Sequence, residues 1–393
     1  MTQQVLIIGA GRIGRGFIAH LFHRSGYKLW FTDASKEVVD RLNREKRYRV
    51  DIAGEQEDKA EYIDVEGACT PDEKEKIAGI LDAVDIIASS VGAANIEATA
   101  RTIKAALRSA NRKRPLNWLI CENANDPAKT IRNVLLQDAD AAWAAYVQSS
   151  IGLVETQVLR TGMSASGDVL ASEPLALRMQ DWWTLPLDKD AFIGAVPEVL
   201  GFRPRANFSH ELMRKIYTFN GTNGPIAYIG WANGYQILHE SALAYPHFFQ
   251  TIQEEASHGL TGEFGYEEAE QKAFAALAMK KYTDPALHDQ IERNACDSKR
   301  KLAVQERLLG PALLCLKHGR TPLAYATAIA AAYHYNGSPD AGTQEVQAAV
   351  SRLGIENAVK KYSSLDESSA LYPLILEAYR QKSFLFQTPT MKL

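Results

Sequence analysis

The sequence predicts an α/β protein in which a doubly wound parallel sheet is followed by a mainly α-helical C-terminal domain. Three observations predict this fold class. Short apolar runs alternate with helical stretches over residues 4–121, which is typical of a parallel sheet with right-handed crossovers. From about residue 209 the pattern is helical almost to the end of the chain. The length of 393 residues favours two domains over a single core.

The first predicted strand is the apolar run at residues 4–8, which ends abruptly at Gly9 and is typical of a buried parallel strand. A helix is expected over about 14–25, because apolar side chains recur there at helical spacing. Residues 28–32 form the second predicted strand, which Asp33 closes. The chain therefore opens with a strand–helix–strand unit.

Two further strands are expected at 83–89 and 117–121, separated by a helix over about 95–109. Each of these strands is again an apolar run between more polar segments. In the second half of the chain, the Ala-rich stretches 269–280 and 324–334 predict helices, because alanine has the highest helix propensity.

The chain changes character at about 154–200, where Gly, Ser, Asp and Pro separate expected strands at 156–160 and 175–180. We interpret this segment as a strand-rich extension of the first domain. The predicted domains are therefore residues 1–205 and residues 206–393.

Composition and charge exclude several classes of protein. The net charge of −3 and the pI near 6.3 give no broad positive surface for nucleic acid or an acidic membrane. No apolar run reaches the roughly 18 residues of a membrane-spanning helix, and the first residues do not read as a secretory leader. The cysteines are widely separated, and the histidines show no metal-ligand spacing. We therefore expect a cytoplasmic monomer or homodimer with reduced thiols and no metal ion.

A glycine-rich turn follows the first strand, and its sequence Gly9-Ala10-Gly11-Arg12-Ile13-Gly14 has the spacing G-x-G-x-x-G. Asp33 lies 19 residues beyond Gly14, where a dinucleotide-binding Rossmann domain places its ribose-binding acid. Such a carboxylate repels a 2′-phosphate, which favours NAD over NADP. A turn without a ligand, and the same fold binding FAD or an S-adenosyl compound, are the alternatives. The predicted cofactor-binding residues are Gly9, Gly11, Arg12, Ile13, Gly14, Asp33, Val91 and Asn123.

Oxidation of an alcohol by hydride transfer needs a base for the hydroxyl proton and donors for the oxygen. Lys215 has apolar and aromatic neighbours, and desolvation by such neighbours lowers the pKa of a lysine. Asn220 and Asn223 are three residues apart and so share a helical face, while Asn123 follows a predicted sheet strand. By itself, however, this pattern is better explained by a surface lysine beside helix-capping asparagines.

Five segments carry a resemblance to a known family over nearly the whole chain: residues 9–17, 121–123, 215–220, 300–302 and 330–334. Through them the sequence resembles the polyol-specific long-chain dehydrogenases, the mannitol dehydrogenase family. The resemblance implies NAD-dependent interconversion of a polyol or a mannitol-1-phosphate-like polyol phosphate with the ketose or sugar phosphate. It also implies a role for each site residue: Lys215 as general base, Asn123 and Asn220 as donors to the carbonyl oxygen, and Arg300, Lys301 and His334 as substrate contacts.

Three positions depart from the family pattern. Asn223 replaces a histidine of the signature, Cys296-Asp297-Ser298 replaces Arg-x-Pro, and Asn336 replaces an arginine. Because arginine forms strong bidentate bonds to phosphate, these losses favour a shifted substrate within the same chemistry, ahead of neutral drift and of lost catalysis. In addition, the Gly224-Pro225 step should break or kink the helix, since proline lacks an N–H donor.

Two rival functions stay open at this point. A β-hydroxyacid or sugar-acid dehydrogenase has a similar scaffold and would prefer carboxylated substrates. A non-catalytic NAD(H)-binding sensor would bind the cofactor without turnover, and Asn223 and Cys296 are the residues that motivate it.

Overall fold

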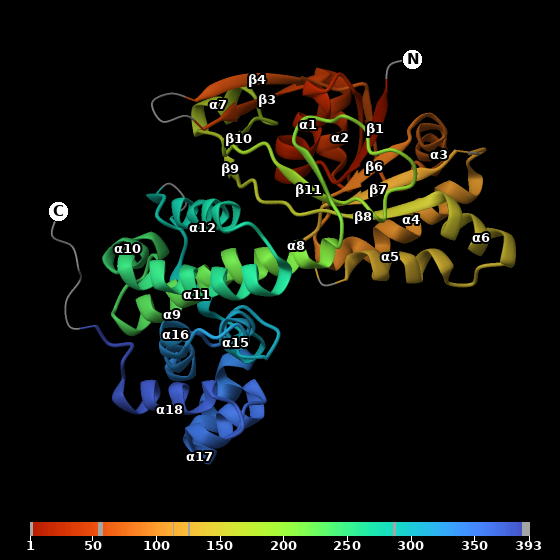
Figure 1. The fold of residues 1–393 in the computed structure, drawn as a ribbon. Coiled ribbons are helices and arrows are strands. Elements are labelled where there is room, and N and C mark those ends of the chain that lie inside the picture. The colour runs from red at the N-terminus through yellow and green to blue at the C-terminus, as the bar shows by residue number, and fades with distance from the viewer. Residues whose placement is uncertain (1–2, 54–57, 113, 125, 286–287, 387–393) are drawn as a thin grey trace. The chain divides into compact units, whose positions relative to one another are not determined.

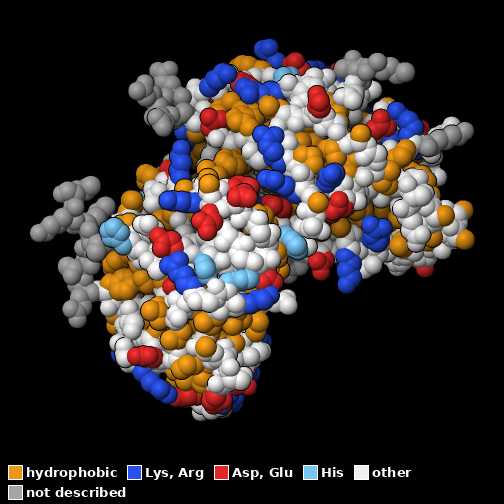
Figure 2. All heavy atoms as spheres, viewed as in Figure 1, with side chains coloured by type: hydrophobic (Ala, Val, Ile, Leu, Met, Phe, Trp, Pro, Cys, Tyr) orange, Lys and Arg blue, Asp and Glu red, His pale blue; other side chains and the backbone are white. Residues whose placement is uncertain are grey.

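The computed structural model describes most of the chain, as residues 3–53, 58–112, 114–124, 126–285 and 288–386 (Figure 1). The chain divides into two compact units, Met1–Glu211 and Leu212–Leu393. On the face drawn in Figure 2, acidic and basic side chains are interspersed, in keeping with the small net charge.

The first unit is built on a six-stranded parallel sheet with the strand order β5-β2-β1-β6-β7-β8. Its strands are β1 (Gln4–Ile8), β2 (Lys28–Thr32), β5 (Gly67–Cys69), β6 (Ile86–Ser89), β7 (Leu116–Ile120) and β8 (Ile151–Glu155). The strand order reverses between β1 and β6, whose last residues Ile8 and Ser89 are register partners. This confirms the predicted doubly wound sheet and places the topological switch point directly beyond Ile8.

Helices cover both faces of this sheet, as the alternation of side chains along β1 requires. Val5 and Ile7 belong to one buried cluster, whereas Leu6 and Ile8 belong to another. The first cluster is completed by the helical turn η1 (Gly14–Ile18), α1 (Ala19–Arg24) and α2 (Lys36–Glu45). The second is completed by α3 (Lys74–Ala83), α4 (Ile96–Ser109), α5 (Pro127–Leu136) and α6 (Ala141–Ser150). The remaining short helices of this unit are η2 (Ala93–Asn95) and α7 (Gly167–Ser172).

Two smaller sheets complete the first unit. One has the order β4-β3-β10-β9 and the other pairs β11 with β12. Their strands are β3 (Arg47–Ile52), β4 (Lys59–Asp64), β9 (Gly162–Ser164), β10 (Leu177–Met179), β11 (Leu185–Asp188) and β12 (Phe202–Arg205). The sequence did not predict β3 and β4, because their half-exposed, charged strands lack the apolar runs of the main sheet.

Two strand predictions in this unit were wrong in part. The strand expected at 83–89 begins only at Ile86, because α3 extends to Ala83. The strand expected at 156–160 does not form, and only Thr156 makes an isolated bridge, to Leu187. There, the hydroxyl of Thr156 donates to the carbonyl of Ile120 (3.1 Å), so side-chain contacts replace a strand ladder.

The second unit is mainly helical, as predicted. The long helix that enters it runs through α8 (Phe208–Lys215), the π-helical turn η3 (Ile216–Asn220) and α9 (Gly221–Ala232). The others are α10 (Leu238–Ala244), α11 (Pro246–Phe264), α12 (Glu268–Tyr282), α13 (Ile291–Ala295), α14 (Ser298–Lys301), α15 (Leu309–Lys317), α16 (Leu323–His334), α17 (Ala341–Ser363) and α18 (Leu371–Gln381). No helix in the described ranges is long and apolar enough to cross a membrane.

A break or kink was expected at Gly224-Pro225, and the helix does not break there, because α9 continues through Pro225. Proline cannot donate to the carbonyl four residues earlier, which here belongs to Gly221. The hydroxyl of Tyr325, on the buried helix α16, donates to that carbonyl at 3.0 Å. A side chain from a neighbouring helix therefore supplies the hydrogen bond that Pro225 removes.

Because the Tyr325 hydroxyl replaces the donor that Pro225 lacks, the effects of changing these two residues on the free energy of unfolding should be coupled. Tyr325→Phe leaves the carbonyl of Gly221 buried without a donor and should lower the free energy of unfolding by about 1–3 kcal/mol. In a Pro225→Ala background the new N–H at residue 225 serves the same carbonyl, so the Tyr325→Phe change should cost much less. Urea unfolding of the two single variants and the double variant measures this coupling. Equal costs in both backgrounds would contradict the explanation.

Candidate active site

The glycine-rich turn joins β1 to η1 at the switch point. Gly9 has a φ of +94°, and a Cβ at Gly9 would lie 2.6 Å from the carbonyl oxygen of Ser90, just past β6. A Cβ at Gly14 would lie 1.9 Å from the carbonyl oxygen of Gly9. By contrast, a Cβ at Gly11 would meet nothing within 4 Å. Two glycines therefore permit the tight turn, and the third keeps its outer side open.

Asp33 ties the end of β2 to this turn. Its carboxylate accepts hydrogen bonds from the backbone N–H of Ala10 (2.6 Å) and of Ser35 (2.8 Å). A carboxylate has about four lone-pair sites, so these two bonds leave acceptor capacity. Asp33 is partly exposed, and a ribose hydroxyl can reach that remaining capacity.

The two arginines of the turn have different environments. Arg12 is exposed, whereas Arg15 is buried and donates from Nε to the carbonyl of Ala10 (2.6 Å) and from Nη1 to that of Leu175. Burial lowers the pKa of Arg15. Arg15 thus braces the turn from behind, while Arg12 is the arginine available to a phosphate. Ile13 packs against the buried cluster beneath.

On the other side of the switch point, Glu122 orients the loop that follows β6. Its carboxylate accepts hydrogen bonds from the N–H groups of Val91 (2.7 Å) and Gly92 (2.9 Å). Burial raises the pKa of Glu122, and these two bonds oppose the rise. Asn123, the next residue, is exposed, and its side chain has no hydrogen-bond partner among the described residues. Sequence reasoning named Val91 and Asn123 but did not foresee that Glu122 fixes the backbone of Val91.

In the second unit, Lys215 ends α8 and is partly buried. No described residue forms a hydrogen bond or an ion pair with its ammonium group. Burial, and then repulsion by Lys281 and Arg307, lower the pKa of Lys215 to about 8. A substantial fraction of this amine is therefore neutral near neutral pH, as a general base requires.

The π turn η3 decides which side chains share a face with Lys215. In a regular α-helix, Asn220 would be rotated by about 140° from Lys215, since five residues span about 1.4 turns. The N–H of Gly221 instead bonds the carbonyl of Ile216, five residues earlier, and this wider turn brings Asn220 back toward the face of Lys215. No described residue hydrogen-bonds the Asn220 amide. Both side chains are therefore available to a ligand.

Asn223 is almost fully buried, and its orientation is fixed by a residue that the sequence did not point to. Its Nδ2 donates to Oδ1 of Asn294 (2.8 Å), and Nδ2 of Asn294 donates to the carbonyl of Gln290 (2.8 Å). Because a backbone carbonyl only accepts, this series of hydrogen bonds fixes which atom is nitrogen and which is oxygen in both side-chain amides. Asn223 consequently presents its carbonyl oxygen, an acceptor, to whatever binds beside it. No sequence spacing connects residues 223 and 294.

The predicted substrate contacts differ in placement. Lys301 is buried, and its ammonium donates to the carbonyls of Asn294 (2.7 Å) and Cys296; burial lowers the pKa of Lys301 to about 8. Arg300 pairs with Asp297 (2.7 Å) and Glu306 (2.8 Å). Lys301 therefore binds the C-terminal end of α13, which carries Asn294, and Arg300 and Lys301 both stay predictions as substrate contacts.

His334, the third predicted substrate contact, ends α16 and packs against aromatic rings. Its ring lies 6.0 Å from that of Trp231 and 5.1 Å from that of Phe384, between ring centroids. Trp231 follows Lys215 by 16 residues in one helical segment, about 24 Å along the axis at 1.5 Å per residue. His334 therefore lies toward the end of this helical segment that is distant from Lys215, and its role as a substrate contact stays a prediction.

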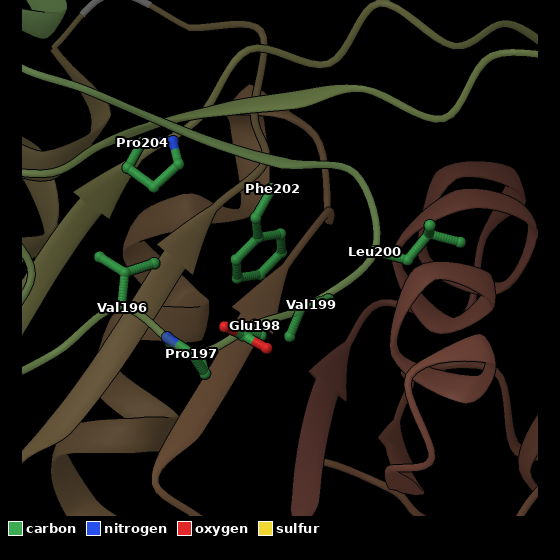
Figure 3. Close-up of a pocket in the computed structure, with 7 residues that line it drawn as sticks. All are labelled: Val196, Pro197, Glu198, Val199, Leu200, Phe202 and Pro204. Carbon is green, nitrogen blue, oxygen red and sulfur yellow. The ribbon is translucent and has the colours of Figure 1, made fainter.

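A surface pocket elsewhere in the first unit contains none of the predicted site residues. Figure 3 shows it in the segment around β12, with a volume of about 500 Å³. Its lining residues are Val196, Pro197, Glu198, Val199, Leu200, Phe202 and Pro204. It offers one carboxylate among apolar groups, and no group suited to hydride-transfer chemistry. Among the residues that the structure describes, no cluster of His, Cys, Asp or Glu could hold a metal ion.

Comparison with known proteins matches both halves of the chain to one family. Residues 3–195 match the model of the mannitol dehydrogenase Rossmann domain, and residues 209–370 that of the mannitol dehydrogenase C-terminal domain. The mannitol-1-phosphate 5-dehydrogenase of Thermoanaerobacter pseudethanolicus is 31% identical, with 96% of this chain and 98% of the relative covered. That of Caldanaerobacter subterraneus subsp. tengcongensis is 28% identical, with 96% and 97% covered.

Two solved structures share the fold. A D-sorbitol dehydrogenase in substrate-free form superposes with a TM-score of 0.79 at 14% identity, covering 98% of this chain and 94% of that chain. The Pseudomonas fluorescens mannitol 2-dehydrogenase ternary complex with NAD and D-mannitol gives a TM-score of 0.67 at 15% identity, covering 98% and 92%.

The role of Glu122 in ordering the loop after β6 can be tested by replacing one of its carboxylate oxygens with an amide nitrogen. Glu122→Gln leaves only one acceptor oxygen for the two N–H groups of Val91 and Gly92, which should cost about 1–3 kcal/mol of stability and weaken NADH binding. Glu97→Gln is the matched control, because Glu97 is exposed on α4 and, among the described residues, pairs with Arg101 alone. Thermal unfolding and NADH fluorescence titration measure both effects. Indistinguishable behaviour of the two variants would show that Glu122 does not order this loop.

Proposed function

The chain belongs to the mannitol dehydrogenase family, and from this premise we propose that it is an NAD-dependent oxidoreductase of polyols. It interconverts a polyol, or a polyol phosphate such as mannitol 1-phosphate, with the corresponding ketose or sugar phosphate. The observation that carries this proposal is the environment of Lys215: a partly buried amine that pairs with no described carboxylate, has a pKa lowered to about 8 and shares a helical segment with Asn220 and Asn223.

The first unit fits a dinucleotide in three respects. The turn at Gly11 has open space on its outer side, the helix that follows presents its N-terminus to the turn, and Asp33 retains acceptor capacity for ribose hydroxyls. The side chain of Arg12 is exposed beside this turn and is suited to a phosphate oxygen. The chemistry that NAD⁺ supplies when bound is acceptance of a hydride from the carbinol carbon of the substrate.

The second unit supplies the proton chemistry. Nζ of Lys215, in its neutral form, accepts the proton of the substrate hydroxyl as the carbonyl forms. The amide Nδ2 of Asn220 donates to the same oxygen and stabilises the negative charge that develops on it. Asn223 has its Nδ2 engaged by Asn294, so its Oδ1 accepts from a second substrate hydroxyl. We retain Asn123 as the proposed donor from the first unit.

This arrangement explains why asparagine replaces histidine at residue 223. Residue 223 adjoins Gly224, on which the side chain of Arg307 packs, so a protonated imidazole at residue 223 would add another positive charge. A neutral amide at residue 223 adds no charge, so the pKa of Lys215 is set by burial, Lys281 and Arg307 alone. The replacement is thus compatible with activity and does not by itself indicate a sensor.

Removing the base tests the proposal directly. Lys215→Met should lower the turnover of the best polyol substrate by about 10²–10⁴-fold, the usual contribution of general base catalysis, while NADH binding persists. The assay is NADH formation against free polyols, polyol phosphates and sugar acids. Unimpaired turnover of the variant would refute the role of Lys215, and silence of the wild-type enzyme on the whole panel would refute the proposed function.

The pH dependence has opposite signs in the two directions. For oxidation, kcat/KM should rise about tenfold per pH unit below about pH 8 and level off above it, because only the neutral amine of Lys215 accepts a proton. For reduction, which needs the protonated amine, activity should fall above about pH 8. Steady-state kinetics in both directions, at saturating cofactor, measure the two profiles. Parallel profiles, or an oxidation midpoint near pH 10, would contradict the proposal.

A further inference from the structure

Two cationic side chains from separate elements influence Lys215. Lys281 comes from the last turn of α12, and Arg307 from the segment between α14 and α15. Both lower the pKa of Lys215 by repulsion. Lys301 is influenced in the same direction by Arg307. Lys215 is the proposed base, and Lys301 donates to backbone carbonyls. Lys281 and Arg307 have no role in the chemistry so far described.

Two glycines place Arg307 on the helix that carries the proposed base. A Cβ at Gly224 would lie 3.5 Å from Cδ and 3.7 Å from Cγ of Arg307, and a Cβ at Gly221 would lie 3.3 Å from its backbone carbonyl oxygen. The side chain of Arg307 therefore packs against the first turn of α9 at Gly224. Glycine at both positions lets the two chain segments come this close.

Lys281 reaches the same region from the other side of the π turn. Its neighbour Tyr282 donates a hydrogen bond to the carbonyl of Phe219 (3.0 Å), which fixes the end of α12 against η3. Lys281 is partly buried, and no described residue forms a hydrogen bond or ion pair with its ammonium group. The carboxylate that influences it, Asp289, is already held by Arg293 in two hydrogen bonds of 2.8 and 2.7 Å.

Arg307 is likewise incompletely neutralised. Its Nε donates to Glu306 at 3.2 Å, but Glu306 also accepts from Arg300 at 2.8 Å. The two terminal nitrogens of Arg307 have no partner among the described residues, and the side chain is only 15% exposed. Burying cations without counter-charges is costly. We therefore expect Arg307 and Lys281 to bind an anion.

We propose that Arg307 and Lys281 bind the phosphate group of the phosphorylated polyol whose hydroxyl Lys215 deprotonates. This inference rests on the proposed function and narrows its substrate class. A phosphate monoester carries close to two negative charges at neutral pH, which matches the two cations, whereas a carboxylate carries one. The planar guanidinium can bind two phosphate oxygens at once. Arg307 thereby offsets the arginines missing at residues 296 and 336.

The test compares discrimination between mannitol 1-phosphate and mannitol. Arg307→Gln and Lys281→Gln should each lower the ratio of the two kcat/KM values by about 10- to 100-fold, mainly through a higher KM for the phosphate ester. Arg307→Lys should retain part of the discrimination, because lysine keeps the positive charge but cannot bind two phosphate oxygens at once as a guanidinium does. Lys280→Gln, one residue earlier on α12 and exposed, and Arg352→Gln, exposed on α17, are controls that should behave as wild type.

Inorganic phosphate gives a readout that does not depend on turnover. It should raise the thermal unfolding temperature of the wild-type protein and the Lys280→Gln control, and should lose this effect in Arg307→Gln. Turnover with an unchanged discrimination ratio in both variants would overturn the phosphate assignment and leave the proposed function standing. A carboxylated substrate whose KM depends on Arg307 would also overturn it. Absence of turnover on every polyol and polyol phosphate would instead defeat the proposed function itself.

Discussion

The proposed chemistry depends on one constraint: the amine of Lys215 is buried near other cations and kept away from carboxylates. Desolvation and repulsion both favour the neutral amine, and together they lower its pKa to about 8. Several unusual features of the second unit serve this constraint. The π turn aligns Asn220 with the amine, the glycines at 221 and 224 admit Arg307, and Tyr325 allows the helix to continue through Pro225.

The first unit meets a different requirement, which is a precisely shaped backbone at the switch point of its sheet. Polar side chains fix that backbone from beneath. Arg15 binds the carbonyl of Ala10, Asp33 binds its N–H, and Glu122 binds the N–H groups of residues 91 and 92. A loop held in this way is ordered before a ligand arrives, so that binding pays less for ordering it.

Much of this organisation could be predicted from the sequence, because it depends on local patterns. The apolar run before Gly9, the spacing of the glycines and the position of Asp33 specify the strand, the turn and the acid independently of distant residues. The apolar neighbours of Lys215 allowed a lowered pKa, although the local pattern alone favoured a surface lysine. The parallel sheet and the helical second half followed from periodicity, which each segment carries within itself.

The remainder depends on contacts between distant segments, to which a single sequence gives no guide. Pro225 indicated a break, since nothing in the sequence connects it to the hydroxyl of Tyr325. The pairing of Asn223 with Asn294 and the approach of Arg307 to Gly224 are of the same kind. The hairpin of β3 and β4 escaped prediction because its strands are short of apolar residues.

The central claim is tested most directly by titrating Lys215 itself. The rate at which an amine-reactive reagent labels this residue, followed by mass spectrometry of the Lys215 peptide, reports the fraction of neutral amine at each pH. The structure predicts that the reactivity of the Lys215 amine is half-maximal at about pH 8 in the protein without ligand. A midpoint near 10.4, the value of an unperturbed lysine, would contradict the claim that burial and neighbouring cations prepare Lys215 as the base.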